Sequence, residues 1–284
     1  MNAAMTMAWS YDGWRPSTSY SGPGEGRGAL AAGWTVPERD EVYRCDVVGF
    51  ARERLGFEPD RLQEDVLRGG KRVMLCCSRQ WGKSTVTAVK ALHQAYFDPQ
   101  ALVLIASPSL RQSRFLMRTI RDLAARLGVG RLRGDGDNEV SLQFPGGGRV
   151  VGLPGNPNTV VGFAGVSMLI FDEAARVRDE LFEALNPVLA VSGGTLWCLS
   201  TPMGKRGFFW RIWARGDGGW MRISAPATEC ARIPAAFLEQ QRRDLPDRKF
   251  RQEYLCEFLE AEGAVFTAGM IANLFSRVVQ AVEY

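Results

Sequence analysis

Residues 73–86, Val73-Met-Leu-Cys-Cys-Ser-Arg-Gln-Trp-Gly-Lys-Ser-Thr-Val86, decide the fold. An apolar run over 73–77 turns into a polar loop ending in Gly82-Lys83-Ser84, and a helix-like segment follows over 85–96. This order of strand, tight loop and helix is the layout of a phosphate-binding loop. Its backbone N–H groups and the helix dipole both favour an anion. We expect Lys83 to reach nucleotide phosphates and the Ser84 hydroxyl to bind Mg²⁺.

The match to the loop pattern is incomplete at its first position. The full pattern G-x-x-x-x-G-K-[ST] requires glycine at position 77, where this chain has Cys77. A chance Gly-Lys-Ser after a buried strand is therefore the alternative that the loop alone leaves open.

A second strand-like run, over 166–173, ends in two adjacent acids, Asp172 and Glu173. In a nucleotide enzyme the first acid holds the water shell of Mg²⁺ and the second polarises the attacking water. The alternative is two solvated acids at a strand end. Two motifs in this order, each after a predicted strand, favour the catalytic interpretation.

A third run, over 195–200, ends in Ser200-Thr201-Pro202. In a parallel sheet, polar residues at this strand end lie beside the terminal phosphate, because ligands collect at the carboxyl ends of the strands. Further runs predict a buried strand over 101–106, a helix over 110–127, a hairpin over 140–153 and a helix over 208–213. The pattern predicts an α/β fold with a mostly parallel sheet flanked by helices.

The outer parts of the chain have different patterns. Residues 1–37 are rich in Gly, Ser and Pro without a period, which predicts a disordered or loosely packed arm. Residues 37–55 and 234–259 have helical patterns, as does a stretch of the tail over 270–282. We predict a nucleotide-binding core over 38–225 and a helical lid or linker over 226–284. Asp60 is expected to cap a short helix that carries Gln63.

Composition narrows the function classes. The 284 residues carry one histidine, His93, which disfavours a His-based triad and a His-rich metal site. The six cysteines form no C-x-x-C pair, and we expect them to be reduced thiols that fill core space. No apolar run approaches the roughly 20 residues of a membrane span, and the N-terminus lacks a signal-peptide pattern, which predicts a cytoplasmic protein. The net charge of +4 is compatible with nucleic acid. One helical face carries several arginines at three- and four-residue spacing: Arg111, Arg114, Arg118 and Arg121.

The chain resembles the ATPase domain of the large terminase subunit, the DNA-packaging motor of tailed bacteriophages. The similarity covers about residues 40–268. The segments that carry it are Ser78-Arg79-Gln80-Trp81-Gly82-Lys83-Ser84, Ile170-Phe171-Asp172-Glu173-Ala174-Ala175 and Ser200-Thr201-Pro202-Met203-Gly204. This family tolerates a loop without the first glycine, which accounts for Cys77.

The resemblance implies a RecA-like P-loop NTPase of the additional-strand type and ATP hydrolysis coupled to movement of double-stranded DNA. Glu173 would be the catalytic base, Arg79 would contact the γ-phosphate, and Ser84 with Asp172 would bind Mg²⁺. Ser200, Thr201 and Pro202 would couple hydrolysis to motion. The implied ATP-binding residues are Gln63, at the adenine, and Ser78, Arg79, Gln80, Trp81, Gly82, Lys83, Ser84 and Thr85.

The implied partners are double-stranded DNA, a capsid portal protein and a small terminase subunit, with the subunits arranged as a ring in the host cytoplasm. Two departures from the family are visible. Val161 stands where many relatives carry an arginine thought to act in trans, so Arg149, Arg176 or Arg178 would have to serve. Relatives continue into a two-metal nuclease domain, and we expect no nuclease activity in residues 1–284.

Two other functions are weighed against the packaging motor. A helicase-type ATPase acting on single strands would need two RecA-like domains, and one fits here. A non-catalytic assembly protein, which binds ATP or a portal without hydrolysis, would account for the missing arginine and nuclease.

Overall fold

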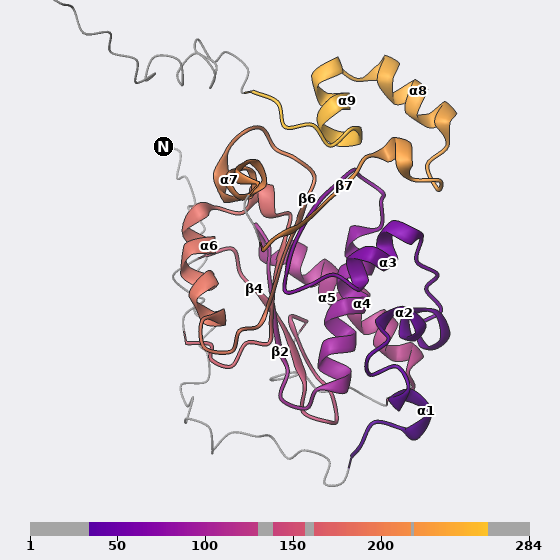
Figure 1. Ribbon diagram of the computed structural model, residues 1–284, viewed down its shortest axis with the longest axis vertical. Helices are drawn as coiled ribbons and strands as arrows, with labels where there is room; N and C mark the ends of the chain where they lie inside the picture. The colour runs from indigo at the N-terminus through magenta and orange to yellow at the C-terminus, as the bar shows by residue number, and fades with distance from the viewer. Residues whose placement is uncertain (1–33, 130–138, 157–161, 217–218, 261–284) are drawn as a thin grey trace, which may run out of the picture.

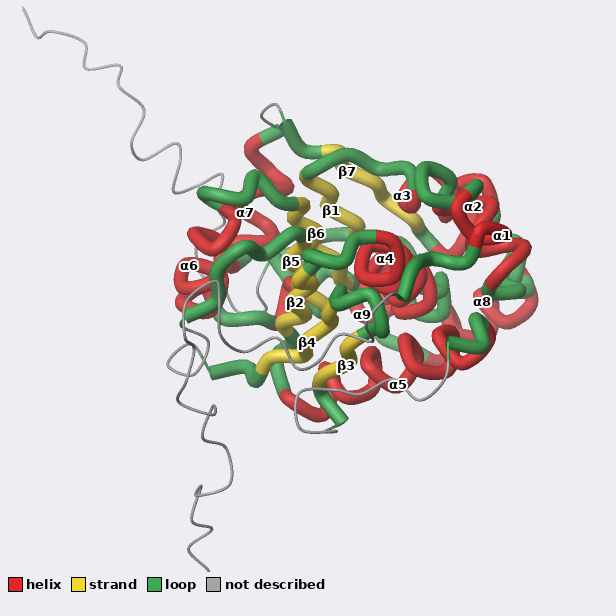
Figure 2. Tube along the Cα trace, turned by 90° about the horizontal axis from the view of Figure 1, so that it is seen from below, coloured by secondary structure: helices red, strands yellow, loops and turns green. Residues whose placement is uncertain are grey.

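The computed structural model describes residues 34–129, 139–156, 162–216 and 219–260 (Figure 1). Its centre is a seven-stranded sheet in the order β3-β4-β2-β5-β6-β1-β7. Figure 2 shows this order, from β3 at the bottom of the view to β7 at the top. The strands are β1 (Arg72–Cys77), β2 (Leu102–Ala106), β3 (Ser141–Gln143), β4 (Arg149–Leu153), β5 (Met168–Asp172), β6 (Thr195–Ser200) and β7 (Met221–Ala225). Every neighbouring pair is parallel except β3–β4, the predicted hairpin. The predicted α/β class is therefore confirmed.

Strand β6 lies between the strand of the phosphate-binding loop and the strand of the two acids. Its register pairs Ser200 with Cys76 of β1, and Leu199 with Asp172 of β5. Because these strands are parallel and end at similar heights, the three sequence motifs meet at one edge of the sheet. The position of β6 is the additional-strand arrangement that the family resemblance implies.

Helices cover both faces of the sheet. In Figure 1, α6 and α7 lie on one side, and α2, α3, α4 and α5 on the other. The helices are α1 (Glu38–Glu41), α2 (Val47–Gly49), α3 (Arg61–Leu67), α4 (Lys83–Phe97), α5 (Leu110–Arg126), α6 (Asp179–Leu185), α7 (Gly207–Arg215), α8 (Ala235–Asp244) and α9 (Asp247–Tyr254). Shorter turns are the π-helical η1 (Phe50–Arg54) and the 3-10 helices η3 (Ala174–Arg176), η4 (Asn186–Leu189) and η5 (Ala227–Glu229).

The core is divided by the sheet into two apolar clusters. Val73 and Leu75 of β1 pack on the α4 side, whereas Met74 and Cys76 pack on the α7 side. This division follows from the alternation of side chains along a strand. Both faces are apolar, as expected for a parallel sheet covered by helices on each side.

Two helix predictions are wrong in detail. Residues 37–55 do not form one helix, because the Asp46 side chain accepts the N–H of Gly49 at 3.0 Å and starts a new helix there. Residues 234–259 form two helices separated at Pro246, and the helical structure ends at Tyr254. Proline disfavours a helical conformation in the residue before it, which explains the break.

The ends of the chain lie mostly outside the described residues, including the predicted arm up to residue 33 and the predicted helix over 270–282. Trp34 packs edge-on against Tyr96, with ring centroids 5.9 Å apart. Helices α8 and α9 lie beyond the top of the sheet in Figure 1, where they form a small apolar cluster with Ala227. No helix among the described residues is long and apolar enough to cross a membrane.

Candidate active site

The loop between β1 and α4 has the backbone of an anion-binding site. Gln80 and Gly82 adopt positive φ angles of 63° and 97°, which bend the chain from the strand into the helix. Trp81 anchors the bend with a side chain that is 2% exposed. Within the part of the chain that the structure describes, no side chain caps the first turn of α4. The N–H groups at the start of this helix are therefore available to a phosphate.

Gln63 and Arg232 hold this loop from outside. The Gln63 amide donates to the Trp81 carbonyl at 2.9 Å and accepts the Asp60 N–H at 3.0 Å, which completes the predicted cap of α3. Arg232 donates to the same Trp81 carbonyl at 2.6 Å. The adenine contact expected of Gln63 stays a prediction, and in this structure its buried amide supports the loop. Arg232 lies in no motif, so the sequence did not point to it.

Lys83 joins the loop to the two acids of β5. Its ammonium group is 3.0 Å from Asp172 Oδ1 and 2.5 Å from Glu173 Oε1. Burial alone would lower the pKa of Lys83, but the two carboxylates outweigh it and raise the pKa above its ordinary value. The lysine therefore stays charged, and the first two motifs of the sequence form one ionic cluster.

Glu173 has an unusual backbone conformation. Its φ of 54° is in the left-handed region, which is uncommon for a residue other than glycine. The chain then enters the 3-10 turn η3, so Arg176 folds back onto Glu173. The guanidinium NH1 donates to Glu173 Oε2 at 2.8 Å and to Thr201 Oγ1 at 3.0 Å. Strained residues of this kind collect at functional sites.

Helix α9 brings a further acid to the site. Glu253, 2% exposed, accepts a hydrogen bond from Arg79 Nε at 2.5 Å. Lys249 lies 2.8 Å from its other oxygen, and Arg176 lies 3.8 Å from the same oxygen. Burial raises the pKa of Glu253, but the hydrogen bonds from Arg79 and Lys249 lower it more, so the net shift is downward. Glu253 was not predicted from the sequence, because it lies 174 residues from Arg79 in the chain and belongs to no motif.

The remaining predicted residues lie at the same edge. Ser200 and Thr201 are buried at the end of β6, and the Ser200 hydroxyl donates to the Thr201 carbonyl at 2.7 Å. Ser78 is buried where β1 ends, Ser84 and Thr85 lie in the first turn of α4, and Pro202 follows Thr201. Of the arginines considered for a trans role, Arg176 is bound within its own chain, Arg178 donates to the Gly155 carbonyl, and Arg149 lies in β4. Val161 is outside the described residues.

The donor set suits magnesium bound together with a nucleotide. Asp172 offers a carboxylate, and Ser84 offers a hydroxyl at the start of α4. Oxygen donors of this kind are what Mg²⁺ prefers, with water and phosphate oxygens completing its shell. The described residues contain no cluster of three or more Asp, Glu, His or Cys side chains that would hold a metal alone. The site therefore fits an ion that arrives with phosphates.

The buried cysteines and His93 have structural roles. Burial raises the pKa of Cys77 and Cys198, as expected for thiols that fill core space. Burial lowers the pKa of His93 to about 4, and its ring bonds to the Tyr43 carbonyl at 2.9 Å. His93 is a half-buried, neutral histidine.

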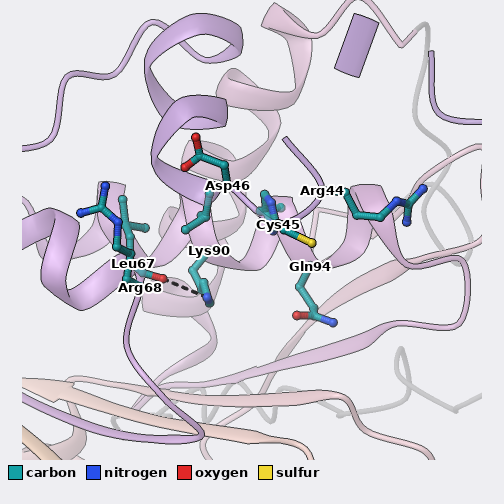
Figure 3. Close-up of a pocket in the computed structure, with 9 residues that line it drawn as sticks. Arg44, Cys45, Asp46, Leu67, Arg68, Lys90 and Gln94 are labelled. Carbon is teal, nitrogen blue, oxygen red and sulfur yellow. Dashed lines mark hydrogen bonds between the residues drawn. The ribbon is translucent and has the colours of Figure 1, made fainter. Parts of the chain in front are cut away.

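A hollow of about 350 Å³ lies elsewhere, between the chain before α2, the end of α3 and the outer face of α4 (Figure 3). Lys90 in this hollow donates to the Leu67 carbonyl at 2.9 Å. Arg44 and Arg68 at its rim already pair with acids. None of its lining residues belongs to the phosphate-binding loop or to the acidic strand end, so it is separate from the ionic site.

The sheet order, the loop before α4 and the acids after β5 define a RecA-like P-loop fold. Residues 74–272 match the family model described as "Terminase large subunit, T4likevirus-type, N-terminal". Since this match spans most of the chain, the protein belongs to the large terminase family, as its sequence motifs predicted.

Similar proteins agree with this assignment. The large terminase subunit of Thermus phage G20c is 26% identical over 256 residues, covering 76% of this chain and 52% of that protein. A variant of the large terminase ATPase domain of Thermus phage P74-26 has a TM-score of 0.63 at 24% identity, over 73% of this chain and 97% of that one. The large terminase of another thermophilic bacteriophage, in complex with ATP-γ-S, has a TM-score of 0.56 at 15% identity, over 76% and 52%. The chain thus spans about half the length of the curated relatives.

Proposed function

We propose that this chain is the ATP-hydrolysing motor domain of a phage large terminase, which drives double-stranded DNA into a procapsid. The observation that carries the proposal is the contact of Lys83 with both Asp172 and Glu173. This contact joins a phosphate-binding loop to an Asp-Glu pair, the two acids that nucleotide hydrolysis needs. The likeness to a terminase in complex with ATP-γ-S supports the same ligand class.

The proposed reaction is hydrolysis of the terminal phosphoanhydride. The loop N–H groups and Lys83 bind the β- and γ-phosphates. Glu173 takes a proton from a water molecule, whose oxygen forms a bond to the γ-phosphorus while the bond to the ADP oxygen breaks. The products are ADP and inorganic phosphate. Mg²⁺, held through Ser84 and Asp172, would neutralise charge on the phosphates. Gln63 is assigned to the adenine, and Arg79 to the γ-phosphate.

The coupling of hydrolysis to movement is assigned to the end of β6. Ser200, Thr201 and Pro202 follow β6, which lies between the strand of the phosphate-binding loop and the strand of the acids. A shift of either neighbouring strand end would therefore move them. Residues 38–225 would form the motor core, and residues 226–284 a lid or linker.

The DNA partner is supported by the charge of α5. Arg111, Arg114 and Arg118 are exposed on one face of this helix, as their spacing predicted. Arg121, the fourth arginine of that face, is half-buried and donates to the carbonyls of Glu139 and Ser141. Such a row can follow the phosphates of a duplex. We further propose that the chain works as part of a ring in the host cytoplasm, together with a portal protein and a small terminase subunit.

A nucleotide-binding assembly protein is the second candidate, and Val161 in place of the expected arginine favours it. Phosphate release by the full chain, measured with Mg²⁺ and ATP in the presence and absence of double-stranded DNA, separates the two. Hydrolysis that DNA stimulates is the expected result. Tight nucleotide binding with no release, even with DNA and portal added, would identify the assembly protein, and strand separation would indicate a helicase.

A further inference from the structure

Arg176 is a residue to which neither the motifs nor the family resemblance assigns a role within its own subunit. Its NH1 is shared between Glu173 Oε2 and Thr201 Oγ1, at 2.8 and 3.0 Å. The side chain is 24% exposed, and Thr201 is 4% exposed, so the contact is largely shielded from water. One guanidinium thus connects the predicted base to the end of the neighbouring strand.

The local backbone favours this contact. The left-handed conformation of Glu173 ends β5 sharply, and the Arg176 N–H then donates to the Glu173 carbonyl at 2.8 Å. This single 3-10 turn brings side chains three residues apart onto the same side. Arg176 therefore contacts the Glu173 carboxylate and Thr201, which follows the neighbouring strand β6, at the same time.

The two oxygens of Glu173 are held by different cations. Oε1 lies 2.5 Å from Lys83, and Oε2 lies 2.8 Å from Arg176. A lysine on a flexible stem can move to a phosphate when one arrives, whereas a planar guanidinium bound to two acceptors is held in place. Nucleotide binding would thus free Oε1 and leave Oε2 fixed.

We propose that Arg176 is the positioning residue of the catalytic base: it fixes Oε2 of Glu173 against Thr201, so that Oε1 faces the attacking water. This inference rests on the proposed hydrolytic function. In the step it serves, a water proton passes to Oε1, the water oxygen bonds to the γ-phosphorus, and ADP leaves with the bridging oxygen. Arg176 remains charged throughout and contacts no substrate atom.

The test compares Arg176→Gln and Arg176→Lys with Arg211→Gln in the full chain. Arg211 is an exposed arginine of α7 that pairs with Asp179 and not with Glu173, which makes it a matched control. The measurements are kcat and KM for ATP, ADP affinity by calorimetry, and the thermal midpoint. Misplacement of a reacting group costs about 10²-fold in rate. We therefore expect Arg176→Gln to lower kcat by about 100-fold and to change KM and ADP affinity by less than about twofold.

A second arm places Arg176→Gln in the Glu173→Gln background. If Arg176 acts through Glu173, the double variant is no slower than Glu173→Gln alone, because effects of residues that act as a unit do not add. Arg176→Lys should recover part of the rate, since it keeps the charge but not the two-acceptor geometry. Thr201→Val should lower kcat less than Arg176→Gln does, with KM again unchanged.

Several outcomes would overturn the proposal. A raised KM with normal kcat would make Arg176 a nucleotide contact. A loss of equal size in the Glu173→Gln background would make its role independent of the base. If the unaltered chain neither binds nor hydrolyses ATP, the proposed function itself fails. If the unaltered chain hydrolyses ATP and Arg176→Gln behaves like Arg211→Gln, only the positioning role fails.

Discussion

Helix α4 begins at Lys83, whose ammonium faces two carboxylates, and its last turn carries Tyr96, whose hydroxyl donates to the buried Asp40 at 2.6 Å. Both ends of the helix thus contact buried acids. At a rise of 1.5 Å per residue, Lys83 and Tyr96 are about 20 Å apart along the helix axis. At the first end the backbone includes left-handed residues, and none of the described side chains caps the helix. At the last end Asp40, 0% exposed, is 2.5 Å from Arg54 and sits beside packed aromatic rings.

The two ends of α4 differ in role: the contacts of Lys83 suit ligand binding, and those of Tyr96 suit stability. The acids near Lys83 lie beside uncapped N–H donors and contact several cations, so their partners can be exchanged when a ligand binds. Asp40 is enclosed, and it contacts Tyr96 and Arg54. The cluster at Lys83 is therefore a candidate functional site because uncapped N–H donors and a strained backbone lie beside it. Burial of an acid does not by itself indicate a functional site. The following predictions test this contrast.

The largest expected effect is on hydrolysis. Glu173→Gln removes the proposed proton acceptor but keeps the shape of the side chain, and general-base catalysis contributes about 10²–10⁴-fold in rate. We expect turnover to fall by about 10³-fold, with ATP-analogue binding and the thermal midpoint retained. Glu183→Gln, at an exposed acid of α6, is the control. Normal turnover in Glu173→Gln would refute the base assignment.

At the other end, Arg54→Met should affect stability and leave the chemistry alone. The substitution removes the closer of the two arginines beside the buried Asp40 and leaves Arg39, at 3.8 Å, which costs about 3–5 kcal/mol in the free energy of unfolding. Urea unfolding measures this loss, and nucleotide affinity is expected to be unchanged. Arg52→Met is the matched control on the same turn, because Arg52 pairs at the surface with Glu58. An equal loss in both variants would contradict the difference between the two ends.

The pH dependence of stability should report His93, near the last turn of α4. Its pKa is lowered by burial to about 4, below the roughly 6.5 of an unfolded chain. Between these values the unfolded state binds more protons, so stability is complete above pH ~6.5 and is lost as the pH falls towards ~4. The contribution lost by pH ~4 is about 3 kcal/mol.

His93→Gln should remove this part of the pH dependence. Unfolding in urea at several pH values, on the unaltered chain and the variant, measures the difference between the two slopes. Identical slopes would show that His93 is not buried in its neutral form.

The smallest expected effect concerns Gly82, before the first residue of α4. A Cβ atom there would lie 2.8 Å from the Gln63 amide nitrogen, in a backbone with a φ of 97°. Gly216 also has a positive φ, but no atom of the described residues lies near its would-be Cβ, so Gly216→Ala measures the conformational strain alone. Gly216→Ala should lose about 1–2 kcal/mol of stability from this strain, and Gly82→Ala at least as much. Only Gly82→Ala should also weaken nucleotide binding, which calorimetry would detect.

Much of the core was predictable from the sequence because each buried strand is a short apolar run followed by polar residues. The runs at 73–77, 101–106, 166–172 and 195–200 all became parallel strands. The helices over 37–55 and 234–259 were predicted less well, since Asp46 and Pro246 interrupt patterns that are otherwise periodic. Local capping and proline chemistry decided those boundaries against the hydrophobic period.

The candidate site divides in the same way. Lys83, Asp172 and Glu173 were predicted because each follows a strand in a recognisable order. Arg232 and Glu253 were missed, because each reaches the phosphate-binding loop from an element that carries no motif. Arg176 was considered only as a candidate trans arginine, and the structure shows it bound to Glu173 of its own chain.

By itself, the sequence determined the strand runs, the phosphate-binding loop and the acid pair, because apolar periodicity and loop chemistry are local properties of the chain. Only the tertiary structure decided that β6 lies between the two motif strands and that α9 returns to the loop. It alone also revealed which cation contacts each oxygen of Glu173. Such contacts join residues that are distant in the chain, and they depend on strand order and on a single left-handed residue, neither of which has a local sequence pattern.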